Sequence, residues 1–257
     1  MTESMTDLAA MRAAGAAPGL PSPPDICAAV QGVSKTYRDG SMEIHALRNV
    51  SFAVPADSFT MLVGRSGSGK TTLLNILGCI DRPSSGSVTI EGQAVEGKSD
   101  RELTDFRARK VGFIFQNFNL VPVLTAYENV ELGLHRADLS AARRRAVTRE
   151  MLDAVGLADR ANHRPGQLSG GQKQRVAVAR ALVKGPAFVL ADEPTANLDS
   201  ETGAEIVALM RNMQRTTRTA FIFSTHDKDL IRQADHLFVL KDGVLDSDAA
   251  ETAGAQP

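Results

Sequence analysis

The most specific chemistry in the sequence belongs to a glycine-rich loop that matches the pattern G-x-x-x-x-G-K-[ST]. Its residues are Gly64, Arg65, Ser66, Gly67, Ser68, Gly69, Lys70 and Thr71. Glycines let the backbone curl so that successive N–H groups point at phosphate oxygens, and a following helix adds the positive end of its dipole. We expect Lys70 to contact the β- and γ-phosphates of a nucleotide, Thr71 to offer a hydroxyl to Mg²⁺, and Thr72 to contact the phosphate nearer the sugar. A glycine-rich turn without a ligand is the alternative interpretation.

Two adjacent acids form a second candidate group. Asp192 and Glu193 follow the apolar run 188–191, which has the length of a buried strand. An acid at the carboxyl end of such a strand can hold Mg²⁺ directly or through water, and we assign this role to Asp192. Glu193 can then orient and polarise the water that attacks the γ-phosphorus. A strand that ends in solvated acids is the alternative, but the phosphate loop earlier in the chain favours catalysis.

The elements around these motifs predict an α/β fold. Short β-like runs over 26–54 favour a small antiparallel sheet, and the phosphate loop lies between a strand at 58–63 and a helix at 71–78. Further strands are expected at 87–90, 111–115, 188–191, 220–224 and 237–240, and helices at 141–155, 172–182 and 200–215. Strands that alternate with helices favour a mainly parallel sheet with helices on both faces.

Composition excludes several classes of protein. The 257 residues are 43% hydrophobic, which is enough for a sizeable core, and 29 Lys+Arg against 30 Asp+Glu leave no basic excess for a nucleic-acid partner. No apolar run approaches the roughly 20 residues of a membrane-spanning helix. The two cysteines, Cys27 and Cys79, have no paired spacing and are interpreted as ordinary small side chains.

The ends of the chain differ from its middle. Residues 1–25 are rich in Ala, Pro, Gly and Ser, and we interpret them as a disordered tail; an export signal is disfavoured by Glu3 and Asp7. Residues 246–257 are interpreted as a second tail. This places one folded domain at 26–245, with a helical subdomain at about 117–170.

A motif at residues 168–172 identifies a family. Leu168, Ser169, Gly170, Gly171 and Gln172 resemble the signature of the ABC ATPases. Ser169 and the glycines also make physical sense as a second phosphate cradle, since unpaired N–H groups lie at the start of a helix.

Further positions match the same family in order and spacing. The resemblance implies that Gln116 is the Q-loop glutamine, which touches Mg²⁺ or the attacking water, and that His226 is the switch histidine that contacts the γ-phosphate. Tyr37 is placed like the aromatic residue that stacks on adenine, and 197–199 resembles the loop that crosses between subunits. Taken singly, each has an ordinary structural explanation, and only their conjunction favours the functional interpretation.

The resemblance implies a fold and an assembly. The expected fold is a P-loop NTPase (RecA-like) core with an antiparallel β subdomain and an α-helical insert that carries the signature. The resemblance also implies ATP and Mg²⁺ as ligands. In the family, the signature of one subunit covers the ATP held by the other, so the expected assembly is an ATP-dependent homodimer. The expected partner is an integral-membrane permease, with the subunit held peripherally at the cytoplasmic face of the inner (plasma) membrane.

Looser resemblances indicate a branch of the family. The stretches 73–83, 115–120 and 128–130 are similar to the bacterial lipoprotein-release, macrolide-efflux and cell-division ATPases. This branch implies a lipoprotein, lipid, peptide or drug handled at the outer side of the membrane. A regulatory ATPase of a cell-envelope complex is an alternative, and a non-transport ABC ATPase acting on DNA or ribosomes is a weaker one.

Overall fold

The computed structural model describes residues 26–40, 42–225 and 228–246. By contact clustering the chain forms two compact units, which we call the phosphate-loop unit (residues 21–107 and 220–257) and the signature unit (residues 108–219). The predicted tail 1–25, His226 and residues 247–257 lie outside the described residues.

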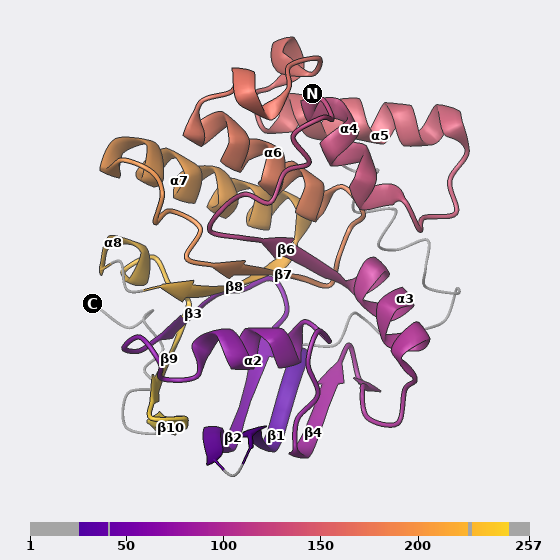
Figure 1. The fold of residues 1–257 in the computed structure, drawn as a ribbon. Helices are drawn as coiled ribbons and strands as arrows, with labels where there is room; N and C mark the ends of the chain where they lie inside the picture. Colours follow the sequence, from indigo (N-terminus) through magenta and orange to yellow (C-terminus); the bar gives the residue numbers. More distant parts are fainter. Residues whose placement is uncertain (1–25, 41, 226–227, 247–257) are drawn as a thin grey trace. The chain divides into compact units, whose positions relative to one another are not determined.

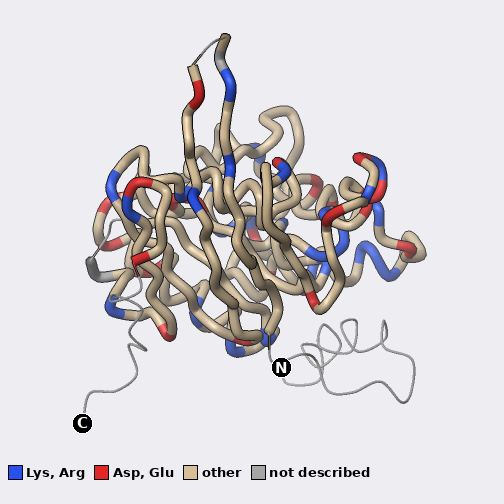
Figure 2. Tube along the Cα trace, turned by 90° about the horizontal axis from the view of Figure 1, so that it is seen from below, with Lys and Arg blue, Asp and Glu red and all other residues tan. Residues whose placement is uncertain are grey.

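The phosphate-loop unit contains an antiparallel sheet with the strand order β2-β1-β4-β5. Its strands are β1 (Ile26–Asp39), β2 (Met42–Pro55), β4 (Ser85–Ile90) and β5 (Gln93–Ala94). Burial alternates along the second half of β2, where Val50, Phe52 and Val54 face the core, as expected for a strand with one covered face. β1 and β2 form a long antiparallel hairpin. Basic and acidic residues are mixed along the Cα trace of the chain (Figure 2).

The same unit contains a second set of strands around β3 (Phe59–Val63). β3 pairs in parallel with β8 (Ala220–Thr225) on one side and β9 (His236–Lys241) on the other, and β10 (Val244–Asp246) pairs antiparallel with β9. All of β3 except its last residue is buried, which is typical of a parallel strand covered on both faces. Asp246, which the sequence analysis assigned to the C-terminal tail, is the last residue of β10.

Three helices complete the phosphate-loop unit: α2 (Lys70–Leu77), α3 (Asp100–Lys110) and α8 (Lys228–Ile231). α2 follows the phosphate loop directly and buries Leu73, Leu74, Ile76 and Leu77 (Figure 1). The last residues of α3 lead into the signature unit.

The signature unit is mainly helical and has two parallel strands, β6 (Val111–Ile114) and β7 (Phe188–Asp192). Its helices are α4 (Ala126–Glu131), α5 (Ala141–Ala154), α6 (Gly170–Leu182) and α7 (Ser200–Thr217), with short 3-10 turns at Leu132–Leu134, Ala158–Arg160 and Pro165–Gln167. α6 packs against β6, α4 and α7 and is the central helix of the unit (Figure 1).

The predicted α/β fold class is confirmed, and most predicted elements lie within two residues of their observed bounds. Within the described residues, no helix is long and apolar enough to cross a bilayer. Cys27 and Cys79 are buried and not joined in a disulfide, and burial raises the pKa of Cys79 to about 11.

Candidate functional site

The phosphate loop joins β3 to α2, as the sequence predicts, and its curvature depends on two glycines. A Cβ atom on Gly64 would lie 2.2 Å from the Leu240 carbonyl oxygen. Gly69 has a φ of +104°, and a Cβ there would lie 2.5 Å from the carbonyl oxygen of Ala46. A larger residue at either position would move the backbone, so these glycines hold the loop close to its neighbours.

The donors of this loop suit an anion. Gly69 is the N-cap of α2 and offers no side chain, so no side chain caps the first N–H groups of the helix. Lys70 is 9% exposed and its Nζ donates to the carbonyl oxygens of Gly64 (2.8 Å) and Arg65 (3.0 Å), which holds the ammonium over the loop. Ser68 Oγ is buried and has no hydrogen-bond partner among the described residues. This combination of a held cation and uncapped donors fits a bound phosphate chain.

The remaining residues predicted on the loop are accessible. Arg65, Ser66, Gly67 and Thr71 are exposed, and Thr72 is half-buried on the first turn of α2. Tyr37 on β1 is 39% exposed, and its hydroxyl donates to Asp81 Oδ2 at 2.8 Å. Tyr37 and the phosphate loop therefore belong to the same unit.

The acidic pair lies at the carboxyl end of β7 in the signature unit. Asp192 is the last residue of the strand, and both acids are half-buried. Glu193 has a φ of +48°, a left-handed conformation that non-glycine residues adopt rarely and that is found disproportionately at functional sites. The next residue, Pro194, accepts a 2.7 Å hydrogen bond from Gln174 Nε2, and Gln174 on α6 is fully buried. This bond ties the acidic loop to the signature helix.

Gln116 lies in an exposed turn just after β6, and its main chain is held by the loop that follows the acidic pair. Asn197 Nδ2 donates to the Gln116 carbonyl oxygen and to Asn117 Oδ1, both at 2.9 Å. The predicted Q-loop and the predicted intersubunit loop are thus in direct contact.

Ser169 is the N-cap of α6, which begins at Gly170 rather than at Gln172 as predicted. The Gln172 N–H donates to Ser169 Oγ (3.2 Å) and the Ser169 N–H donates to Gln172 Oε1 (3.0 Å), forming a reciprocal capping box. A Cβ on Gly171 would lie 2.6 Å from Thr202 Cγ2 on α7, so glycine permits close packing of the two helices. The N–H groups of Gly170 and Gly171 are left to other acceptors by this cap.

Three contacts in these loops could not be found by inspecting motifs alone. Each is a hydrogen bond between residues at least 20 positions apart in the sequence. The pairs are Gln174 with Pro194, Asn197 with Gln116, and Asp81 with Tyr37. The S-x-x-Q spacing of Ser169 and Gln172 is the one local signal that was available, because it is the pattern of a capping box.

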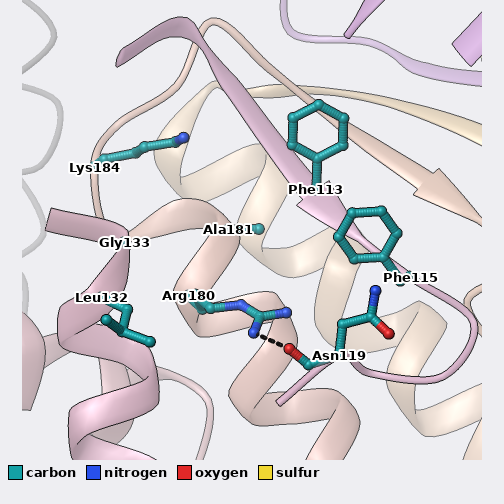
Figure 3. Close-up of a pocket in the computed structure, with 8 residues that line it drawn as sticks. All are labelled: Phe113, Phe115, Asn119, Leu132, Gly133, Arg180, Ala181 and Lys184. Atoms are coloured by element: carbon teal, nitrogen blue, oxygen red, sulfur yellow. Dashed lines mark hydrogen bonds between the residues drawn. The ribbon is translucent and has the colours of Figure 1, made fainter. Parts of the chain in front are cut away.

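A pocket of about 210 Å³ lies beside the segment that contains Gln116 (Figure 3). The Phe113 and Phe115 rings stack in it with centroids 5.7 Å apart, and Arg180 donates to the carbonyl oxygens of Phe118 (2.7 Å) and Asn119 (2.5 Å). Burial lowers the pKa of Arg180 below its ordinary value. The other residues that line the pocket are Leu132, Gly133, Ala181 and Lys184.

The sequence predicts three Mg²⁺ ligands: a hydroxyl (Thr71) in the phosphate-loop unit, and an amide (Gln116) and a carboxylate (Asp192) in the signature unit. All three are hard oxygen donors, which suit Mg²⁺. No group of three or more His, Cys, Asp or Glu side chains in the described part of the chain could hold a metal on its own. Mg²⁺ usually keeps several waters and is bound through one or two carboxylates together with substrate phosphates, so such a cluster is not required.

Comparison with known proteins shows where the sequence belongs. Residues 47–196 match the family described as ABC transporter. An uncharacterised ABC transporter ATP-binding protein of Thermotoga maritima is 48% identical over 83% of this chain and 91% of its own length. The macrolide export ATP-binding/permease protein MacB of Brucella melitensis is 41% identical over 86% of this chain, which covers 34% of that longer protein.

Solved structures agree with these relatives. A dimeric ATP-binding cassette, MJ0796, bound to ADP and Pi in a post-hydrolysis state matches with a TM-score of 0.80 and 42% identity, over 89% of this chain and all of that one. A cbiO1 structure from Clostridium perfringens, part of an ABC transporter complex, matches with a TM-score of 0.79 and 30% identity, over 86% and 87% of the two chains.

Proposed function

The chain belongs to the ABC transporter family as an ATP-binding subunit that hydrolyses ATP, and from this premise we propose that it works as a homodimer that powers a separate membrane permease. The observation that carries the proposal is the cap geometry of two helices, α2 and α6, whose N-termini leave backbone N–H groups for an anion. A single nucleotide-binding chain requires only the first.

The proposed binding step uses the phosphate loop. Backbone N–H groups of residues 64–72 surround the phosphates, Lys70 contacts the β- and γ-phosphates, and Tyr37 stacks on adenine. Lys70 is already held at the loop by the Gly64 and Arg65 carbonyl oxygens, so little side-chain freedom is lost when ATP replaces these acceptors.

The proposed hydrolytic step uses the acids after β7. Glu193 orients the attacking water and accepts its proton, while Gln116 and His226 contact the water and the γ-phosphate. Thr71, Gln116 and Asp192 would hold Mg²⁺, which neutralises charge on the β- and γ-phosphate oxygens when bound. The left-handed conformation of Glu193 is consistent with this assignment, because strained backbone is concentrated at active sites.

The second cradle acts across the dimer. Ser169 and the N–H groups of Gly170 and Gly171 cap the γ-phosphate of the ATP held by the partner subunit, and hydrolysis removes that bridge. The dimeric arrangement of the MJ0796 structures supports this assembly. ATP binding would then favour the closed dimer and hydrolysis the open one, by differential contacts in the two states.

The proposed partner is a permease that reaches the outer side of the membrane, with this chain at the cytoplasmic face. The named relatives MacB and the pyoverdine export protein PvdT of Pseudomonas fluorescens are export proteins in which a permease is part of the same chain. We place the contact surface at the pocket beside Gln116, where Phe113, Phe115 and Leu132 offer apolar surface next to Arg180. The cargo class is a lipoprotein, lipid, peptide or drug, and an envelope-complex regulator is the alternative.

The experiment compares two serines that cap helices with the same geometry. Ser169 and Ser140 each accept a 3.2 Å hydrogen bond from the N–H three residues later, so an arginine at either position removes one helix cap worth about 1 kcal/mol. In a Glu193→Gln background with ATP, we expect Ser169→Arg to remain monomeric in light scattering and Ser140→Arg to dimerise. Both should bind ATP as monomers. Dimerisation of Ser169→Arg equal to that of Ser140→Arg would refute the shared site.

A further inference from the structure

Tyr37 belongs to a charged network whose two other side chains have no role in the assignments above. The network consists of Lys35 and Tyr37, two positions apart on β1, and Asp81 in the turn after α2. Lys35 Nζ donates to Asp81 Oδ1 at 2.6 Å, and the Tyr37 hydroxyl donates to Asp81 Oδ2 at 2.8 Å. One carboxylate therefore accepts from both side chains, with one oxygen for each.

The network is held from behind by the main chain. The Arg82 N–H donates to Asp81 Oδ1 (2.7 Å), and Lys35 Nζ also donates to the Arg82 carbonyl oxygen (2.8 Å). The N–H of Asp81 itself donates to the carbonyl oxygen of Asn75 on α2 (3.2 Å). Asp81 thus links the tyrosine to the helix whose other end begins at the phosphate loop.

Lys35 also covers one face of the Tyr37 ring. Its ammonium lies 4.8 Å from the centroid of the Tyr37 ring, within the range of a cation–π contact. The Lys35 side chain is 13% exposed, whereas Tyr37 as a residue is 39% exposed. Because one face of the ring is covered by Lys35, a flat ligand would stack on the opposite face.

Charge and burial are consistent with a persistent network. Burial works against the ionised form of Asp81, but hydrogen bonds from Lys35, Tyr37 and the Arg82 N–H outweigh it, and the pKa of Asp81 is lowered. Burial and the hydrogen bond to Asp81 raise the pKa of Tyr37, while a hydrogen bond with Thr72 on α2 lowers it. At neutral pH the acceptor is therefore a carboxylate and the donor a neutral phenol, as the geometry requires.

We propose that Asp81 is a positioning residue for the nucleotide base, which together with Lys35 fixes the Tyr37 ring in its stacking orientation before ATP binds. The inference rests on the proposed adenine contact of Tyr37 and adds two residues to it. The network would increase ATP affinity by preorganisation. A tyrosine that is not held in place loses rotamer freedom when ATP binds, and this loss weakens the affinity for ATP by about twofold to tenfold.

The test measures binding of ATP and of inorganic triphosphate, each with Mg²⁺, by calorimetry on the full chain. Asp81→Ala and Tyr37→Phe should each weaken ATP binding about twofold to tenfold and leave triphosphate binding unchanged, because triphosphate has no base. Asp81→Asn keeps an acceptor for the phenol and should recover part of the loss. Asp100→Asn is the control, since the Asp100 side chain is 96% exposed and pairs with Arg82 rather than with Tyr37.

A double-mutant cycle separates positioning from folding effects. Tyr37→Phe together with Asp81→Ala should weaken ATP binding no more than the stronger single change, because both remove the same hydrogen bond. The inference would be overturned by additive losses of ATP affinity in the double variant, by equal losses for ATP and triphosphate, or by no loss of ATP affinity in Asp81→Ala. In each of these cases, normal ATP hydrolysis by the unaltered chain would leave the proposed function standing. Failure of the unaltered chain to bind ATP would overturn both.

Discussion

Two nearby glycines of the phosphate loop should differ in how much stability the chain loses when each is replaced by alanine. Gly67 and Gly69 both have positive φ angles, +79° and +104°. A Cβ on Gly67 would meet nothing within 4 Å, whereas a Cβ on Gly69 would lie 2.5 Å from the Ala46 carbonyl oxygen and 2.9 Å from Leu47 Cδ2. The two alanine variants therefore share backbone strain, and only one of them adds a clash.

The expected losses in the free energy of unfolding follow from these terms. Backbone strain in Gly67→Ala is expected to cost about 1–2 kcal/mol. Gly69→Ala carries strain of about 1–3 kcal/mol and an overpacking penalty of about 1–3 kcal/mol, so its total is about 2–6 kcal/mol. The main-chain oxygen of Ala46 cannot rotate away as the end of a side chain can, so little of the clash is relieved.

Urea unfolding without nucleotide is the appropriate assay, because phosphate contacts then contribute nothing to the comparison. We expect the midpoint to fall clearly further for Gly69→Ala than for Gly67→Ala, with similar slopes in denaturant. Equal midpoints for the two variants would refute the argument, since they would mean that the approach of the Ala46 carbonyl does not restrict this position.

Two further predictions concern the signature unit. Glu193→Gln should keep ATP affinity while lowering phosphate release by about 10² or more, because the water loses its base; near-normal turnover would remove Glu193 from the mechanism. Gly171→Ala should destabilise the chain by about 1–3 kcal/mol, because its Cβ would lie 2.6 Å from Thr202 Cγ2, and adding Thr202→Ser, which deletes that methyl group, should restore most of the loss. Simple addition of the two single effects in urea unfolding would contradict this account.

The strand, loop and helix around the phosphate loop could be predicted because local sequence determines them. An apolar run, a glycine-rich turn and an amphipathic helix each have a short-range pattern, and the observed bounds, β3 at Phe59–Val63 and α2 at Lys70–Leu77, differ from the prediction by one residue. Helix α3 (Asp100–Lys110) had no such pattern. Only Leu103 and Phe106 are buried on it, and the other side chains are mostly charged, so its apolar face is too narrow to recognise.

The start of α6 shows a different limit. Glycines have low helix propensity, so the pattern placed the helix start at Gln172, whereas the structure includes Gly170 and Gly171 in the first turn. Packing explains the difference, because only a residue without a side chain fits against Thr202 at position 171. Contacts such as Asn197 with the Gln116 carbonyl oxygen join residues 81 positions apart, and no local pattern encodes them.

The two phosphate cradles differ in a way that orders the proposed cycle. At α2 the N-cap is Gly69, which offers no side chain, and Lys70 supplies a positive charge, so this cradle can attract a triphosphate by itself. At α6 the hydroxyl of Ser169 accepts from the Gln172 N–H, and because a hydroxyl both accepts and donates, its proton remains available to a phosphate oxygen. Residues 169–172 have no charged side chain, and Lys173 is the first charged residue of α6, so the donors at the tip of this cradle are neutral. Both cradles can donate N–H groups to a phosphate, but only the α2 cradle also has an ammonium group held at its loop, which favours binding of a triphosphate there. In the proposed dimer we therefore expect the nucleotide to bind the α2 cradle of one subunit first and the α6 cradle of the other to close on it second. The comparison of Ser169→Arg with Ser140→Arg tests this order directly, since it requires unchanged ATP binding by the monomer together with failed closure.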